Sequence, residues 1–293
     1  MGSIKKELLS GVFYTAIAKY SGILISLIIT GVLARLISPD KFGIVAVVTV
    51  ITFFFSIFSD LGIAAAIIQN KELQQKDLNQ LFSFTVWSGC ILTLLFFLCS
   101  WPISFFYKEP SMKAITLLLA INLFFASANI VPNALLYKAK AFKFLAWRSL
   151  GVQVSGGIIA ILAALGGAGL YTLIINPILS SILLFIISYQ KYPQTLEMTW
   201  GIPSIRKIFK FSAYQFMFNI INYFSRNLDK LLIGKYMGMS PLGYYEKSYR
   251  LMMLPLQNIT HVITPVMHPI FSDYQHDLNH LANSYEKIIR LLA

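Results

Sequence analysis

The sequence is poor in charged residues and in cysteine. Charged residues make up 12% of the 293 residues, while hydrophobic residues make up 57%. Soluble domains carry about 25% charged residues, so this composition excludes an ordinary soluble all-α protein and indicates a protein with several membrane spans. The two cysteines, Cys90 and Cys99, fall within one apolar run, which predicts neither a disulfide framework nor a cysteine metal site.

Acidic residues are scarce as well, at 12 against 24 lysines and arginines, which gives a formal net charge of +12. The basic residues lie at the ends of apolar runs, and no aromatic and basic platform lies outside those runs. Membrane topology therefore explains them better than nucleic-acid binding. The sequence also lacks a P-loop, a Rossmann glycine fingerprint, a nucleophile elbow and an HExxH motif, so we predict no catalytic residues, no cofactor and no metal.

Eight apolar runs predict membrane helices, and their period and length favour helix throughout. They lie near residues 11–36, 43–69, 80–106, 113–136, 146–166, 169–189, 207–234 and 243–271. A ninth, amphipathic stretch begins near Leu281.

Lysine and arginine are unevenly divided between the two sets of connections. With the N-terminus inside, five lie in outer connections (Arg35, Lys41, Lys108, Lys113 and Lys235). Twelve lie on the inner side: Lys5, Lys6, Lys71, Lys76, Lys138, Lys140, Lys143, Arg148, Lys191, Arg206, Lys207 and Lys210. This bias predicts that the N-terminus lies on the cytoplasmic side of the membrane.

An internal repeat with an offset of 200 residues is visible around the first outer turn. Tyr14 aligns with Tyr214 and Gly43 with Gly243, and each copy has a Ser-Pro turn, at 38–39 and 240–241. Both copies start inside, which predicts a parallel repeat about an axis along the membrane normal. We therefore expect a complete six-helix lobe over 1–190, a cytoplasmic linker over 191–206, and an incomplete second lobe over 207–293 that holds its first two or three helices. The chain is then expected to be truncated at its C-terminus.

A polar stripe interrupts the seventh apolar run. Its members fall within an arc of roughly 100° on a helix: Asn219, Asn222, Arg226, Asp229 and Lys230. Because charges inside a membrane face a bundle interior or a wet cavity, the stripe predicts one wall of such a cavity. The positions 200 residues earlier include Lys19, Ser26 and Thr30, and we expect them on the same cavity.

Equal depth in neighbouring helices suggests two ion pairs, Lys19–Asp60 and Asp229–Arg250. The alternative for Lys19 and Asp60 is that each reaches the interface or bonds the backbone alone. In the eighth run, His261 is either a proton-coupling site or a plain hydrogen-bond partner between helices.

Several short motifs in order resemble one transporter family. They are Leu33-Ala-Arg-Leu-Ile-Ser-Pro-Asp-Lys-Phe-Gly43, Phe58-Ser-Asp-Leu-Gly-Ile-Ala-Ala-Ala-Ile-Ile-Gln69, Phe106-Tyr-Lys-Glu-Pro110, Val131-Pro-Asn-Ala-Leu-Leu136, Asn227-Leu-Asp-Lys-Leu-Leu-Ile-Gly234 and Leu242-Gly-Tyr-Tyr245. Together they resemble the polysaccharide-transporter family within the MOP flippase superfamily. Its Wzx-type branch, the colanic-acid and teichuronic-acid exporters, is the most similar.

The resemblance implies a two-lobed, MATE-like helical bundle with a central cationic cavity and no enzymatic activity. Such a protein would flip undecaprenyl-pyrophosphate-linked oligosaccharide for surface polysaccharide, in contact with membrane lipids and the polysaccharide polymerase machinery. Arg226 and Lys230 would then bind the pyrophosphate, and polar residues such as Asn219, Asn222 and Ser26 would suit the sugar.

Other readings stay open at this point. A lipid II flippase would share the fold and the cationic cavity, whereas a drug or cation antiporter would favour acidic residues in it. A polymerase or ligase needs a large outer loop, which the short outer connections do not provide. A non-transporting fragment that assembles with another chain is the remaining alternative.

Overall fold

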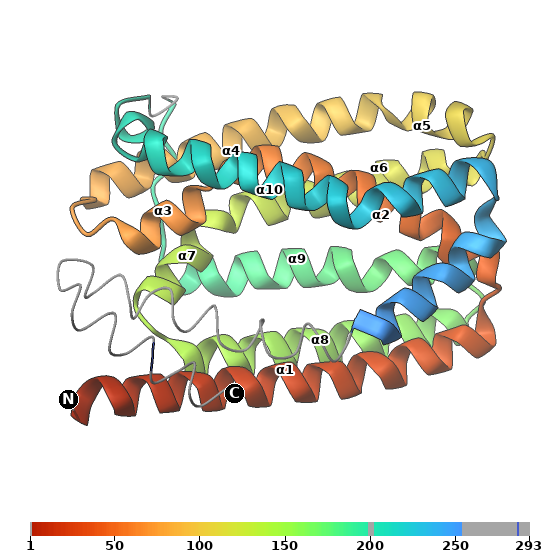
Figure 1. The fold of residues 1–293 in the computed structure, drawn as a ribbon, viewed down its shortest axis with the longest axis horizontal. Coiled ribbons are helices and arrows are strands. Elements are labelled where there is room, and N and C mark those ends of the chain that lie inside the picture. The colour runs from red at the N-terminus through yellow and green to blue at the C-terminus, as the bar shows by residue number, and fades with distance from the viewer. Residues whose placement is uncertain (1, 199–201, 254–285, 287–293) are drawn as a thin grey trace.

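The computed structural model describes residues 2–198, 202–253 and 286, and its regular elements are helices (Figure 1). Six spans in this part are long and apolar enough to cross a membrane: Gly11–Leu36, Pro39–Asp60, Gln75–Tyr107, Ser111–Ala128, Phe142–Leu165 and Gly169–Lys191. The prediction of an all-α polytopic membrane protein is therefore confirmed.

The spans correspond to six pieces of the bundle that run side by side in Figure 1. They are α1 (Gly2–Leu36), α2 (Pro39–Asp60), α4 (Gln75–Leu98) with α5 (Ser100–Tyr107), α6 (Ser111–Ala128), α8 (Phe142–Leu165), and α9 (Thr172–Lys191) after a 3-10 turn at Gly169–Tyr171. α10 (Ile202–Tyr236) is as long as α1 but is not among the six, because the polar stripe interrupts its apolar sequence.

Three of the predicted runs are each divided into two helices, among them the run 80–106, which divides at Cys99 between α4 and α5. The run 43–69 breaks after α2 at Leu61 and Gly62, which have φ angles of 44° and 77°, and continues as α3 (Ile63–Gln69). Glycine adopts that left-handed backbone without a steric penalty, so Gly62 fits the break. The run 113–136 breaks at Asn129, between α6 and α7 (Ile130–Lys138).

The connections alternate between the two ends of the bundle as the eight runs predict. Residues 37–38, 108–110 and 237–238 lie at one end, on the right of Figure 1, and residues 70–74 and 139–141 lie at the other. Arg148 does not belong to a connection, because it lies inside α8 with only 9% of its surface exposed. Lys138, at the N-terminal end of the bundle, donates to the Asn70 carbonyl at 2.7 Å, and burial lowers the pKa of its ammonium.

The main core joins α2, α4, α6 and α9. Val47 and Phe96 are fully buried in it, and Leu242 from the helix after α10 is buried with them. Polar side chains cross-link the same helices: Ser127 donates to Ser59 at 2.7 Å, and the Asn122 amide donates to the Pro177 carbonyl at 2.8 Å. Such bonds fix the helices relative to one another where lipid supplies no hydrophobic driving force.

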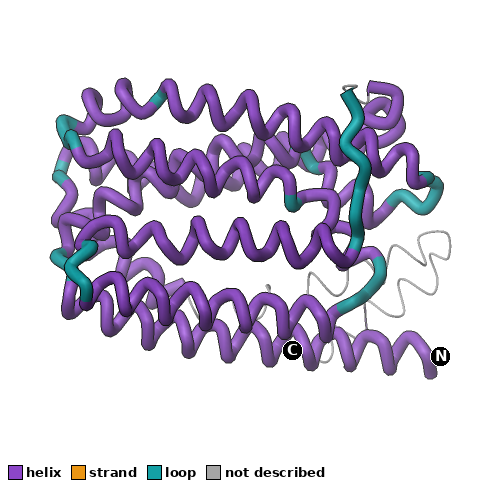
Figure 2. The backbone as a smooth tube through the Cα atoms, turned by 180° about the vertical axis from the view of Figure 1, so that it is seen from behind, coloured by secondary structure: helices purple, strands orange, loops and turns teal. Residues whose placement is uncertain are grey.

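The segment between α9 and α10 is fastened along α4 (Figure 2). The Gln75 amide donates to Gln194 at 2.9 Å, the Trp87 indole donates to the Glu197 carbonyl at 3.0 Å, and the Ser204 hydroxyl donates to Asp77 at 2.7 Å. Within the predicted linker 191–206, Gln194, Glu197 and Ser204 are therefore bound to α4.

Candidate functional site between the repeats

The repeat predicted from the sequence has a structural counterpart. α10 covers Ile202–Tyr236, 200 residues after α1 at Gly2–Leu36, and a helical segment at 239–253 follows it as α2 follows α1. The two second helices meet through their glycines. A methyl group built on Gly43 would lie 2.0 Å from the Met239 carbonyl oxygen, and one built on Gly243 would lie 2.1 Å from the Pro39 carbonyl oxygen. This reciprocal contact is what a two-fold relation between the copies predicts.

Two hollows lie on the seams between these copies. The first, which we call the Lys230 hollow, has a volume of about 340 Å³. Its polar lining comes from α1, α2, α9, α10 and segment 239–253: Ser26, Thr30, Thr49, Thr172, Asn176, Asn227, Lys230, Glu246 and Arg250. The second, the Arg226 hollow, has a volume of about 380 Å³ and lies between α2 and α10. It is lined by Phe53, Ser56, Ile57, Asn219, Asn222, Tyr223, Arg226 and Asn227, so Phe53 and Asn227 border both hollows.

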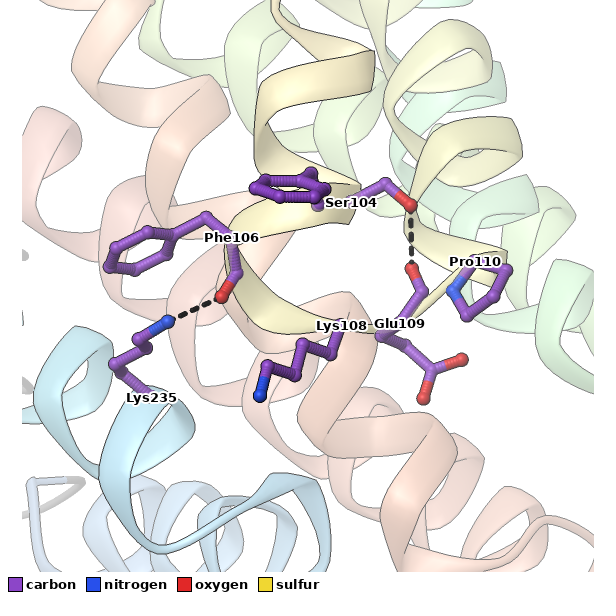
Figure 3. A pocket seen from close by; sticks show the side chains of 7 residues that line it. Ser104, Phe106, Lys108, Glu109, Pro110 and Lys235 are labelled. Atoms are coloured by element: carbon purple, nitrogen blue, oxygen red, sulfur yellow. Dashed lines mark hydrogen bonds between the residues drawn. The ribbon is translucent and has the colours of Figure 1, made fainter.

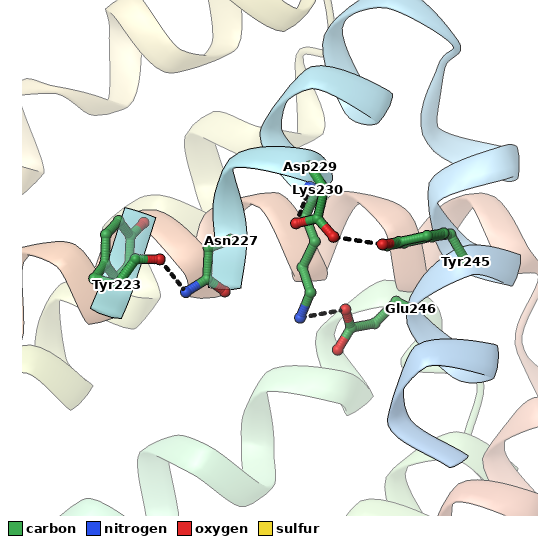
Figure 4. Close-up of polar contacts among 6 residues, drawn as sticks. All are labelled: Tyr223, Asn227, Asp229, Lys230, Tyr245 and Glu246. Atoms are coloured by element: carbon green, nitrogen blue, oxygen red, sulfur yellow. Dashed lines mark hydrogen bonds and ion pairs between the residues drawn. The ribbon is translucent and has the colours of Figure 1, made fainter. Parts of the chain in front are cut away.

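Lys230 is already paired within its hollow (Figure 4). Its ammonium lies 2.7 Å from a Glu246 carboxylate oxygen and 5.0 Å from the centre of the Tyr249 ring. The Lys230 and Glu246 side chains are 12% and 31% exposed, so the pair is shielded more than a surface ion pair. Glu246 therefore compensates the charge of Lys230.

Arg250 is held by hydroxyl groups instead of a carboxylate. Its two terminal nitrogens donate to the Ser26 hydroxyl and, at 3.5 Å, to the Thr30 hydroxyl of α1. Among the described residues it makes no ion pair, and it lines the Lys230 hollow.

Arg226 borders the second hollow and makes no hydrogen bond or ion pair with any residue in the described ranges. The amides of Asn219 and Asn222 lie on the same hollow, and Asn219 accepts from the Gln215 amide at 3.0 Å. The predicted stripe is thus divided between the hollows: Asn219, Asn222 and Arg226 line one, and Lys230 lines the other.

The predicted pair Asp229–Arg250 is not formed in this structure. The Tyr245 hydroxyl donates to the Asp229 carboxylate instead, as Figure 4 shows. The helix after α10 begins at 239, four residues earlier than the run at 243 suggests, so Arg250 lies one turn deeper than Asp229. Tyr245 and Glu246 are the residues at the depth of Asp229 and Lys230.

The predicted pair Lys19–Asp60 is not formed either. Asp60 is the last residue of α2 and accepts from the Ala64 backbone at 3.1 Å, while Lys19 has no polar partner in the described part of the chain. α1 packs along α8, where the Gln153 amide donates to the Gly22 carbonyl at 2.7 Å. Lys19 consequently borders neither hollow, whereas Ser26 borders the Lys230 hollow. His261 lies outside the described residues.

A third hollow, of about 460 Å³, lies at the end of the bundle where α5 ends (Figure 3). The Lys235 ammonium donates to the Phe106 carbonyl at 2.5 Å and lies 3.7 Å from the centre of its ring. The Tyr107 hydroxyl donates to the Leu231 carbonyl at 3.4 Å. These contacts fasten the end of α10 to α5.

Sequence reasoning did not single out Glu246, Thr49 or Asn176 as site residues, although all three line the Lys230 hollow. The available signal was position in the repeat. Thr49 lies on α2 and Glu246 lies on segment 239–253, which are the second helices of the two copies. Both residues lie at the depth of the polar stripe of α10.

A family model described as polysaccharide biosynthesis protein matches residues 32–293 of the chain. The chain belongs to this family. It is 26% identical over 297 residues to the teichuronic acid biosynthesis protein TuaB of Bacillus subtilis and 25% identical over 300 residues to the lipopolysaccharide biosynthesis protein WzxC of Escherichia coli. It is 22% identical over 246 residues to the succinoglycan biosynthesis transport protein ExoT of Rhizobium meliloti.

The matches cover 100%, 99% and 84% of this chain and 61%, 60% and 50% of the three relatives. The chain therefore spans about 60% of the length of the first two. No solved structure matches it significantly. The resemblance of this family member to the polysaccharide-transporter branch of the MOP flippases is confirmed.

Proposed function

We propose that this chain takes part in flipping undecaprenyl-pyrophosphate-linked oligosaccharide across the bacterial cytoplasmic membrane during surface polysaccharide biosynthesis, with its N-terminus in the cytoplasm and without catalysing a reaction. Family membership and relatives named for polysaccharide biosynthesis and transport support the class of substrate. Polysaccharide polymerase machinery is the partner expected to use the flipped product.

The observation that carries the proposal is Arg226, which lines a hollow between α2 and α10 and has no acidic partner among the residues that the structure describes. A pyrophosphate carries at least two negative charges, and a guanidinium in a low-dielectric site binds phosphate oxygens by charge-assisted hydrogen bonds. The amides of Asn219 and Asn222 supply further donors in the same hollow. Neither described hollow has a net negative charge, which disfavours the drug or cation antiporter. Lipid II, which also carries a pyrophosphate, is the competing substrate.

Binding to the purified chain in lipid nanodiscs tests the proposal. Undecaprenyl pyrophosphate with a short glycan should bind, and Arg226→Ala should weaken binding about tenfold or more, because one charge-assisted contact is lost. Arg206→Ala is the matched control, since it removes the same side chain from the same helix outside both hollows. Absence of binding by the unaltered chain, or equal losses in the two variants, would contradict the proposal, and a strong preference for lipid II would reassign the substrate.

A further inference from the structure

We propose that the Lys230 hollow is a sugar subsite for an acidic residue of the glycan, with Arg250 as the ligand of the sugar carboxylate. This inference rests on the proposed function and adds a substrate class to it. It assigns the two hollows different tasks, the pyrophosphate to Arg226 and the first acidic sugar to Arg250.

The lining of the Lys230 hollow has the chemistry of a carbohydrate site. Hydroxyls of Thr30 and Thr49 and amides of Asn176 and Asn227 line it from four different helices. Hydroxyl and amide groups both donate and accept, as sugar hydroxyls require. The volume of about 340 Å³ suits one sugar ring better than a long glycan.

The charges that line the Lys230 hollow favour a ligand with one negatively charged group. Lys230 is compensated by Glu246 at 2.7 Å, whereas Arg250 is held by Ser26 and Thr30, which are neutral. Among the described residues of this hollow, one positive charge is therefore without a negative partner. The planar guanidinium matches a carboxylate in two parallel hydrogen bonds, and neutral hydroxyl partners are displaced at lower cost than a carboxylate partner.

The Lys230 hollow lies next to the Arg226 hollow, as expected if one binds the first sugar and the other binds the pyrophosphate. Phe53 and Asn227 border both hollows, so a group in one lies next to a group in the other. In a lipid-linked oligosaccharide the first sugars follow directly on the pyrophosphate. A doubly charged pyrophosphate in the Lys230 hollow would lie against the Glu246 carboxylate, whereas no carboxylate lines the Arg226 hollow, and this difference disfavours the opposite assignment.

A matched pair of probes tests the inference. Two undecaprenyl-pyrophosphate disaccharides are bound to the chain in nanodiscs, one with glucuronate and one with glucose at the same position. The unaltered chain should bind the glucuronate probe about tenfold more tightly, as expected for one bidentate charge-assisted contact. Arg250→Gln should abolish this preference, while Arg226→Ala should weaken both probes equally and keep it.

The outcomes separate the inference from the function it rests on. If the unaltered chain binds neither probe, the proposed function fails, and the inference falls with it. If it binds both probes equally, or if Arg250→Gln weakens both by the same factor, the sugar subsite is wrong while the proposed function stands. Arg250→Lys is the second variant in case Arg250→Gln does not fold. It should reduce the preference because an ammonium has no bidentate fork, and an unchanged preference would overturn the assignment.

Discussion

α1 and α10 occupy corresponding positions in the predicted repeat, but their surroundings in the bundle differ. Each has 35 residues and they are offset by 200 in the sequence. α1 lies at one side of the bundle and packs mainly on α8, with Gly22 and Gly157 at the contact. α10 lies across α2, α3 and α4 and is fastened at both ends, through Ser204 to Asp77 and through Lys235 to Phe106.

The difference is that the charged residues lining the two hollows come from α10 and segment 239–253, whereas α1 and α2 contribute none of them. Ser26 and Thr30 of α1 correspond to Arg226 and Lys230 of α10. The small α1 residues can pack closely on a neighbour or accept a hydrogen bond from Arg250. The α10 residues instead place positive charge on the seam between the copies. Each of the following predictions tests how far this asymmetry extends.

The largest effect is expected at the reciprocal glycine contact, where the two copies are most alike. Gly43→Val and Gly243→Val each introduce atoms where a backbone carbonyl lies about 2 Å away. Each should lower stability by about 3 kcal/mol, at the upper end of overpacking costs, since a backbone carbonyl cannot rotate away. Thermal unfolding in nanodiscs measures the loss.

Gly31→Val is the matched control, because a methyl group on Gly31 would meet no atom within 4 Å. It should be neutral. The two seam variants should also be equal in effect, because their contacts are equivalent. A clear difference between them would show that the repeats are not related by a two-fold axis at this point.

A charge swap between the copies is expected to have the next largest effect. Arg226→Ser should lose about tenfold in affinity for the pyrophosphate probe. Adding Ser26→Arg to this variant should not restore binding, because residue 26 borders the other hollow and contacts Arg250, which would repel it. Full recovery in the double variant would mean that the two positions serve one common site.

The sequence was sufficient for the helices and insufficient for the partners of the charged residues, and the repeat stays a prediction that the equal lengths of α1 and α10 support. Gly43 and Gly243 predicted the offset of 200, and a Ser-Pro pair stands shortly before each of them, at 38–39 and 240–241. The Lys19–Asp60 pair failed for a different reason. Helices that follow each other in sequence need not pack, and α1 packs on α8.

The predicted ion pair inside the second copy was wrong because the helix after α10 starts one turn earlier than its apolar run suggested. The apolar run suggested a start at 243, yet the helix begins at 239, because Gly238 with a φ angle of 97° ends the turn and Ser240 and Pro241 fall within the first helical turn. That shift replaces Arg250 by Tyr245 as the partner of Asp229 and brings Glu246 to Lys230. Depth estimated from hydropathy has an error of about one turn, which is enough to change a partner.

A smaller effect is expected from Glu246→Gln, which removes the charge that compensates Lys230. The Lys230 hollow would then hold two free positive charges, so binding of the glucuronate probe should tighten a few-fold, or about 1 kcal/mol. Glu72→Gln, at an exposed position between α3 and α4, removes the same charge and should change nothing. Weaker binding in Glu246→Gln would indicate that the carboxylate itself contacts the ligand.

The smallest effect is expected at Lys235, where α10 differs from α1 at its last turn. Lys235→Met removes the contacts with the Phe106 carbonyl and ring, and should cost about 0.5–1 kcal/mol of stability. Arg35 is its counterpart in the repeat, is exposed, and has no polar or ring partner within the described residues. Arg35→Met should therefore be neutral in the same thermal unfolding measurement. Equal losses in the two variants would show that charge at the helix end, rather than the fastening of α10 to α5, is responsible.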